Sequence, residues 1–158
     1  MDYKIIVDSC GELTHKMKRS GVYETASLSM EVDGDIIVDD ESFDQTDFLR
    51  RVAASPECPK SSCPSPERYM ELFEGGEERV YAVTLSSELS GSYNSAELGR
   101  KLWFEEHGSG KEIYVFNSRS ASVGETLIAL KIQECEEAGL GFDETVSTVE
   151  KYIESQHT

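Results

Sequence analysis

The chain has 158 residues, the usual size of a single domain with one hydrophobic core. With 38% hydrophobic and 29% charged residues, it is too apolar for an intrinsically disordered protein and too polar for a membrane-spanning one. The formal net charge of −16 disfavours binding to polyanions, so we expect neither a nucleic acid partner nor stable membrane insertion.

The first third of the chain predicts a strand, a short helix and a hairpin. The run from Tyr3 to Asp8 is apolar and rich in β-branched residues, which favours a strand buried on both faces. Residues 12–19 precede the stop signal Gly21 and predict a small helix. Alternating residues from Ala26 to Val38, interrupted by the turn dipeptide Asp33-Gly34, predict two antiparallel strands.

Two predicted helices flank a proline-rich loop in the middle of the chain. Residues 46–54 begin with a hydroxyl residue that can cap a helix and carry apolar side chains on one face. Three prolines between Ser55 and Ser65 argue against regular structure through most of that segment. The pair Ser65-Pro66 then supplies a capping hydroxyl and a proline at the first helical position, opening a helix that ends at Gly75-Gly76.

The second half of the chain predicts alternating strands and helices. The predicted core positions of its first helix are Ala96, Leu98, Leu102 and Trp103. Because strands alternate with helices, the sequence predicts an α/β fold, a three-layer Rossmann-like domain with a mainly parallel sheet and a small antiparallel hairpin. The predicted strands span residues 80–85 and 112–116, and the predicted helices span residues 92–106, 126–138 and 142–155.

Polar loops follow three of the predicted strands, at Asp8-Ser9, Ser86 to Ser92 and Asn117 to Ser122. In a parallel sheet, ligands bind outside the carboxyl ends of the strands, where such loops meet helix N-termini. The segment from Leu85 to Glu97 holds five serines around one glycine, Gly91, which lets a ligand approach the backbone. Helix N–H groups and serine hydroxyls together favour an anion. The alternative is that Ser90 or Ser92 only caps the helix.

A second hydroxyl-bearing loop, Lys60 to Pro66, also leads into a helix N-terminus. Prolines on either side of Ser65 restrict its backbone, so its hydroxyls lose little conformational entropy on binding. An ordinary loop with a Ser-Pro cap would explain the segment if it stood alone.

Other chemistries fit the sequence poorly. A serine hydrolase needs a histidine base, and none of His15, His107 and His157 lies beside a G-x-S-x-G elbow. The segment Gly108 to Lys111 precedes a strand, whereas a phosphate-binding P-loop follows one. The acidic residues of 33–41 lack the spacing of a calcium loop.

The cysteines and the N-terminus indicate a reducing compartment. No CxxC pair occurs, and no histidine lies at ligand spacing, so we expect reduced structural thiols and no metal site. The N-terminal apolar run is too short for a secretory signal, so we expect a cytoplasmic protein. The cysteines are Cys10, Cys58, Cys63 and Cys135.

Four segments, in this order, resemble motifs of the DegV family. Residues 8–13 (DSCGEL) are similar to its opening D-S-x-x-D-L, and residues 60–66 (KSSCPSP) to its K-T-S-Q-P-S-P loop. Residues 85–96 (LSSELSGSYNSA) resemble its L-S-S-x-L-S-G-T-Y-x-S-A signature, which is the most specific match. Residues 117–124 (NSRSASVG) resemble its D-S-x-x-x-S-x-G stretch. The departures are Ser61 for threonine, Cys63 for glutamine, Asn117 for aspartate, and Glu125-Thr126 where glycine is frequent.

The resemblance implies a carrier without a catalytic residue, metal or cofactor. Family members bind a long-chain fatty acid, hold its carboxylate by hydroxyl groups and present it to a fatty acid kinase, which makes the acyl-phosphate for phospholipid metabolism. By motif position, Ser61 and Ser90 would bind the carboxylate, with Ser62, Gly91 and Ser92 as their support.

The resemblance also sets the expected domain organisation. We expect residues 1–158 to form the N-terminal domain of the family, without the C-terminal domain that helps to enclose the acyl chain. An alternative function from a different class is a small enzyme or binding module that takes phosphate or another small anion at the same serine loops.

Overall fold

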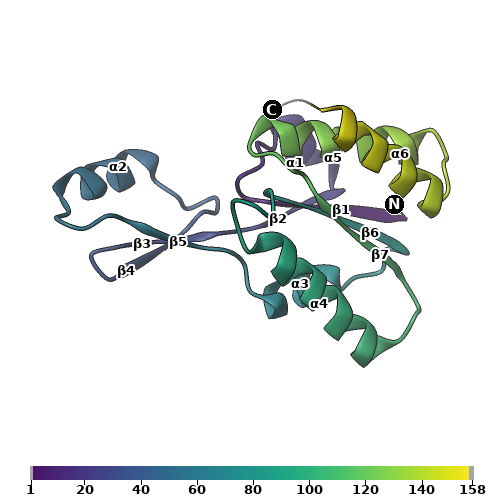
Figure 1. Cartoon of the computed structure of the whole chain (residues 1–158), viewed down its shortest axis with the longest axis horizontal. Coiled ribbons are helices and arrows are strands. Elements are labelled where there is room, and N and C mark those ends of the chain that lie inside the picture. Colours follow the sequence, from purple (N-terminus) through teal and green to yellow (C-terminus); the bar gives the residue numbers. More distant parts are fainter. Residues whose placement is uncertain (1, 157–158) are drawn as a thin grey trace.

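The structure is a computed structural model that describes residues 2–156 and contains two separate sheets (Figure 1). The main sheet is parallel, with the strand order β2-β1-β6-β7. Its strands are β1 (Tyr3–Asp8), β2 (Tyr23–Ala26), β6 (Arg79–Thr84) and β7 (Glu112–Asn117). The helices are α1 (His15–Ser20), α2 (Gln45–Ala54), α3 (Pro66–Phe73), α4 (Ser92–His107), α5 (Val123–Glu137) and α6 (Phe142–Ser155).

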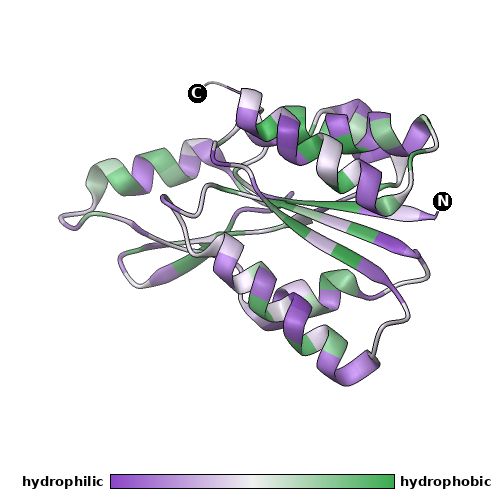
Figure 2. Ribbon diagram, turned by 45° about the vertical axis from the view of Figure 1, so that its right-hand side comes forward, coloured by the Kyte–Doolittle hydropathy of each residue, from purple (hydrophilic) through white to green (hydrophobic). Residues whose placement is uncertain are grey.

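Helices cover both faces of the main sheet, so the predicted three-layer α/β arrangement is confirmed. Helices α1, α5 and α6 lie on one face, and α3 and α4 on the other (Figure 1). Alternate residues of β1 enter opposite layers: Ile5 and Val7 pack with the α5 and α6 side, and Ile6 packs with the α3 and α4 side. The middle parts of β1, β6 and β7 are therefore largely apolar, as Figure 2 shows, whereas β2 at the edge is more polar.

The second sheet extends from the main sheet and carries α2 (Figure 1). It is antiparallel, with the order β4-β3-β5. Its strands are β3 (Ser29–Val32), β4 (Asp35–Val38) and β5 (Lys60–Ser62). The predicted hairpin around Asp33-Gly34 is confirmed, and both turn residues have a positive φ, as a tight turn of this kind requires.

Two strands differ from the sequence prediction. We predicted no strand at Tyr23–Ala26, but this segment forms β2, which pairs in parallel with β1. The proline-rich segment was predicted to be largely irregular, but Lys60–Ser62 forms β5 against β3. Both strands are short, and all three residues of β5 are exposed, so neither carries the apolar pattern by which a strand is recognised.

Three helices, α2, α4 and α5, differ from the sequence prediction in their buried residues or in their first residue. In α4, Ala96 and Trp103 are buried as predicted, but Leu98 is 46% exposed. Gly99 instead faces α3, where a Cβ atom would lie 2.6 Å from the carbonyl oxygen of Pro66. Helix α2 buries no residue, although an apolar face was predicted, and α5 begins three residues before the predicted start, at Val123. None of the helices in the described residues is long and apolar enough to cross a membrane.

Candidate functional site

The three polar loops meet at the carboxyl edge of the main sheet, as predicted. The side chain of Asn117 accepts the N–H of Ser87 at 3.1 Å and donates to the Ser87 hydroxyl at 2.7 Å. The N–H of Ser86 donates to the carbonyl of Ser120 at 2.9 Å. These bonds fix the start of the loop from Ser86 to Ser92, called the serine loop below, against the end of β7. The family's aspartate is replaced by Asn117, whose amide can both donate to and accept from the same residue.

Asp8 joins the end of β1 to the same loop. Its carboxylate is fully buried and accepts the N–H of Leu85 at 2.7 Å and the N–H of Cys10 at 3.1 Å. Burial raises the pKa of Asp8, while hydrogen bonds from the Leu85 N–H and from Glu125 limit that rise. Asp8 therefore fixes the backbone at the start of the serine loop.

Ser90 and Ser92 lie at the start of α4. The N–H of Ser92 donates to the Ser90 hydroxyl oxygen at 3.2 Å, and the two hydroxyl oxygens are 3.1 Å apart. Ser92 is fully buried, whereas Ser90 is only partly buried. Ser90 thus accepts the N–H of the first residue of α4, but Gly91 is the N-cap and no side chain caps this helix, so the capping alternative is wrong in that detail. Ser90 also lines a cavity.

Ser61 reaches that cavity from the small sheet. In β5, Ser61 pairs with Met30 of β3, and Ser61 and Ser62 are both exposed. Gly91 brings the two loops together, because a Cβ atom there would lie 3.1 Å from the sulfur of Cys63. Ser65 caps α3 by accepting the N–H of Arg68 at 3.2 Å and does not line the cavity.

This cavity, called the serine cavity below, has a volume of about 560 Å³ and combines hydroxyls with an apolar wall. Four of the five residues expected at the site, Ser61, Ser62, Ser90 and Gly91, line it, and Ser92 lies behind Ser90. Sequence reasoning missed Asp39, which was noted only among the acidic residues of 33–41. No lysine or arginine is among its lining residues in the described chain. The other lining residues are Cys10, Leu28, Met30, Asp39, Cys63, Leu85 and Leu89.

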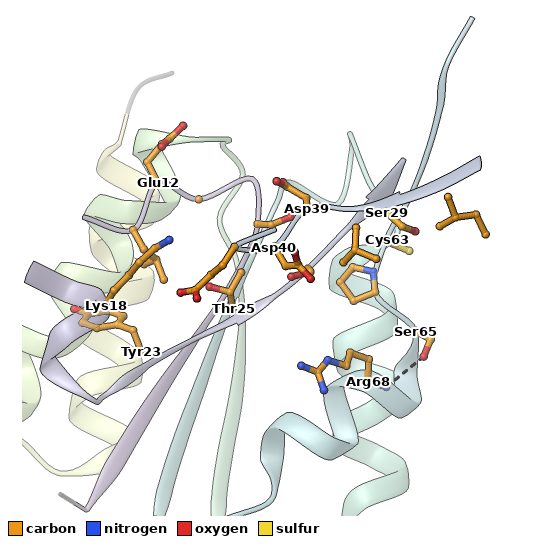
Figure 3. A pocket seen from close by; sticks show the side chains of 18 residues that line it. Glu12, Lys18, Tyr23, Thr25, Ser29, Asp39, Asp40, Cys63, Ser65 and Arg68 are labelled. Atoms are coloured by element: carbon orange, nitrogen blue, oxygen red, sulfur yellow. Dashed lines mark hydrogen bonds between the residues drawn. The ribbon is translucent and has the colours of Figure 1, made fainter. Parts of the chain in front are cut away.

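A larger cleft of about 940 Å³ opens on another side of the β3-β4 hairpin (Figure 3). Figure 3 shows Lys18 and Arg68 on opposite sides of this cleft, with Asp39 and Asp40 between them. Asp39 and Cys63 line both spaces, so the serine cavity adjoins this charged cleft.

Several residues weighed for other chemistries have structural contacts in the described chain. No group of histidine, cysteine, aspartate and glutamate side chains between residues 2 and 156 could hold a metal ion. Lys111, the lysine of the P-loop-like segment, donates to the carbonyl oxygens of Phe73 and Gly75 and so caps the end of α3. His107 lies at the other end of α4, bonded to the carbonyl of Trp103, and His157 lies outside the described residues.

The chain is similar to solved structures of fatty-acid-bound DegV family proteins. A DegV family protein of Ruminococcus gnavus, solved with vaccenic acid, is 57% identical and superposes with a TM-score of 0.94 over 97% of this chain and 55% of its own. The Fatty Acid Kinase (Fak) B3 protein of Streptococcus pneumoniae, loaded with linoleic acid, is 34% identical, with a TM-score of 0.84 over 98% of this chain and 55% of its own.

The curated relatives are also longer than this chain. A DegV domain-containing protein of Streptococcus pneumoniae is 34% identical over 157 residues, which are 98% of this chain and 55% of the relative. The chain thus spans about half the length of the relatives it matches. The model of the DegV family matches residues 2–158. The chain belongs to the DegV family.

Proposed function

We propose that the protein binds the carboxylate of a long-chain fatty acid in the serine cavity. Ser61 and Ser90 donate hydroxyl hydrogen bonds to the carboxylate, while Ser62, Gly91 and Ser92 support them. The observation that carries this proposal is that two loops from different sheets bring these hydroxyls to one cavity. Because the acceptor is charged, each such bond is stronger than a bond between neutral groups.

The cavity wall favours a lipid over phosphate. Leu28, Met30, Leu85 and Leu89 line the cavity beside the serines, and Leu89 is 69% exposed. An inorganic anion would leave this apolar surface in contact with water, whereas an acyl chain would cover it. The similar structures that hold vaccenic acid and linoleic acid support the same ligand class.

We further propose that these residues are the head-group half of a carrier. The chain matches the N-terminal part of relatives about twice its length, so the remaining part of such a protein would enclose the acyl tail. The similar protein named Fatty Acid Kinase B3 supports a fatty acid kinase as the partner that receives the bound carboxylate and makes the acyl-phosphate. In this role the protein presents the fatty acid and performs no chemistry itself.

The test is the affinity of the protein for labelled oleate in the parent and in Ser61→Ala, Ser90→Ala and the double variant. We expect each single substitution to weaken binding by about tenfold or more, since a hydrogen bond to a charged group contributes about 1.5–3 kcal/mol. Ser109→Ala is the matched control, because Ser109 is an exposed serine in the turn before β7. Parent protein that takes up no oleate, or that loses it to competing phosphate, would contradict the proposal.

A further inference from the structure

A buried pair of carboxyl groups lies beneath the serine loop. Asp8 ends β1 and Glu125 lies in the first turn of α5, and both side chains are fully buried. Glu125 packs beside Gly11, where a Cβ atom would lie 3.4 Å from the Glu125 Cβ. Within residues 2–156, no lysine, arginine or histidine forms an ion pair with either carboxyl group. Two such carboxylates without a counter-ion cannot both be ionised at low cost.

The surroundings assign the charge to Asp8 and the proton to Glu125. Asp8 accepts the N–H groups of Leu85 and Cys10, and such bonds stabilise a carboxylate. No N–H or O–H group among the described residues donates a hydrogen bond to either oxygen of Glu125. Burial, followed by the charge of Asp8, raises the pKa of Glu125 to about 10. A protonated Glu125 can donate its hydrogen to the Asp8 carboxylate.

Asp8 also reaches the residue that supports Ser90. It bonds Leu85 at the start of the serine loop, and the Ser92 hydroxyl at the loop's end is among the groups that lower the pKa of Asp8. Ser92 in turn contacts Ser90 through its N–H and its hydroxyl. The negative charge of Asp8 is thus bonded to the start of the loop and lies near Ser92 at its end. A second charge in the same place would repel an incoming carboxylate.

We infer that Asp8 and Glu125 are positioning residues that share one proton, and that loss of this proton weakens binding of the fatty-acid carboxylate at Ser90. This inference rests on the proposed function. By linkage, a bound carboxylate must make Glu125 harder to ionise by the same factor as ionisation weakens binding.

Other titratable groups lie near the pair, and their ionisation could also change oleate binding with pH. Burial raises the pKa of Cys10 to about 12, and burial also raises the pKa of Tyr69, on α3. Cys63 and Asp39 line the adjoining cavity. A substitution at Glu125 leaves all four in place, so the difference between parent and variant isolates the contribution of Glu125.

The experiment measures oleate affinity at pH 7 and pH 10 for the full chain and for Glu125→Gln. Each protein serves as its own reference, so the readout is the ratio of its two dissociation constants. We expect the parent to bind oleate at least fivefold more weakly at pH 10, and Glu125→Gln to lose most of that change, since its amide can still donate to Asp8 and cannot ionise. Glu137→Gln, an exposed position at the end of the same helix, should keep the parent's ratio.

Equal pH ratios in the parent and in Glu125→Gln would overturn the inference while leaving oleate binding intact. If the parent binds no oleate at either pH, the proposed function fails, and the predicted effect on affinity fails with it. The shared proton is then decided by a ¹³C NMR titration of the glutamate carboxyl carbons. A resonance that is missing in Glu125→Gln and titrates above pH 8 supports the shared proton, and one that titrates near pH 4.5 overturns it.

Discussion

Met30 of β3 lies directly opposite Ser61 of β5, and both residues line the serine cavity. Opposite residues of an antiparallel pair point to the same face of the sheet, so the side chain at position 30 is the nearest cross-strand neighbour of Ser61. Strand β5 has three residues and pairs only with β3, which makes the hairpin the support for one of the two proposed ligands.

A charge at position 30 should therefore repel the fatty-acid carboxylate. We expect Met30→Asp to weaken oleate binding by about tenfold, since charges separated by one side chain in a partly buried site interact by a few kcal/mol at most. Ile36→Asp places the same charge on the neighbouring strand β4 at a side chain that is 74% exposed and outside the cavity, and it should bind oleate as the parent does. Equal losses in both variants would contradict this prediction, because the effect would then not depend on a charge next to Ser61.

The close approach of α3 and α4 gives a prediction about stability. Gly99 lies in α4, where alanine usually stabilises a helix by about 1 kcal/mol relative to glycine. Here a Cβ atom would lie 2.6 Å from the carbonyl oxygen of Pro66 and 3.0 Å from the Cβ of Tyr69, so we expect Gly99→Ala to destabilise the protein by about 1–3 kcal/mol. Urea denaturation measures the change. Gly110→Ala, where nothing lies within 4 Å of the added atom, should be close to neutral.

Glu136 of α5 binds two polar side chains, Arg79 and Tyr81, on the face of the main sheet that α5 and α6 cover. Its carboxylate is 3.0 Å from the guanidinium of Arg79 and accepts the hydroxyl of Tyr81 at 2.5 Å. Glu136→Ala would leave the Tyr81 hydroxyl without this acceptor and leave the guanidinium with only its bond to the carbonyl of Leu140 among the described residues. We therefore expect a loss of about 3 kcal/mol in the free energy of unfolding. The neighbouring Glu137 is exposed, so Glu137→Ala should change stability by about 0.5 kcal/mol or less. Similar urea midpoints for the two variants would contradict this assignment.

Local patterns in the sequence predicted the parts of the fold that depend on local physics. Strand β1 and helix α6 have the predicted bounds, and Ser65-Pro66 opens α3 as its capping chemistry indicates. The meeting of the three polar loops followed from a rule for parallel sheets, because the carboxyl ends of all their strands lie at one edge.

What the sequence could not predict depends on contacts between distant segments. Strand β5 exists only because β3 pairs with it, and its own residues carry no apolar pattern. Nothing in the local sequence distinguishes Asp39 from the neighbouring acidic residues, and only the fold shows that it lines the cavity. Glu125 was noted only as a departure from the family motif, since nothing local distinguishes a glutamate that will be buried against Asp8.

The burial of Glu125 also predicts how stability depends on pH. Its pKa is about 10 in the folded protein and about 4.5 in an exposed glutamate. Between these values the unfolded chain releases a proton that the folded protein retains. The unfolding free energy contributed by Glu125 is therefore greatest below about pH 4.5 and is lost as the pH rises toward 10. Each pH unit in this range can remove up to about 1.4 kcal/mol.

Glu125→Gln removes this dependence, because glutamine does not titrate. We expect the parent to lose at least about 1 kcal/mol relative to Glu125→Gln between pH 6 and pH 8, measured by urea denaturation at each pH. Glu137→Gln should follow the parent, since that position is exposed in the folded protein. A constant difference between parent and Glu125→Gln across this range would mean that Glu125 ionises as readily in the folded protein as in the unfolded chain. The buried pair would then carry two charges beneath the serine loop, and binding of a carboxylate there would need a compensating cation.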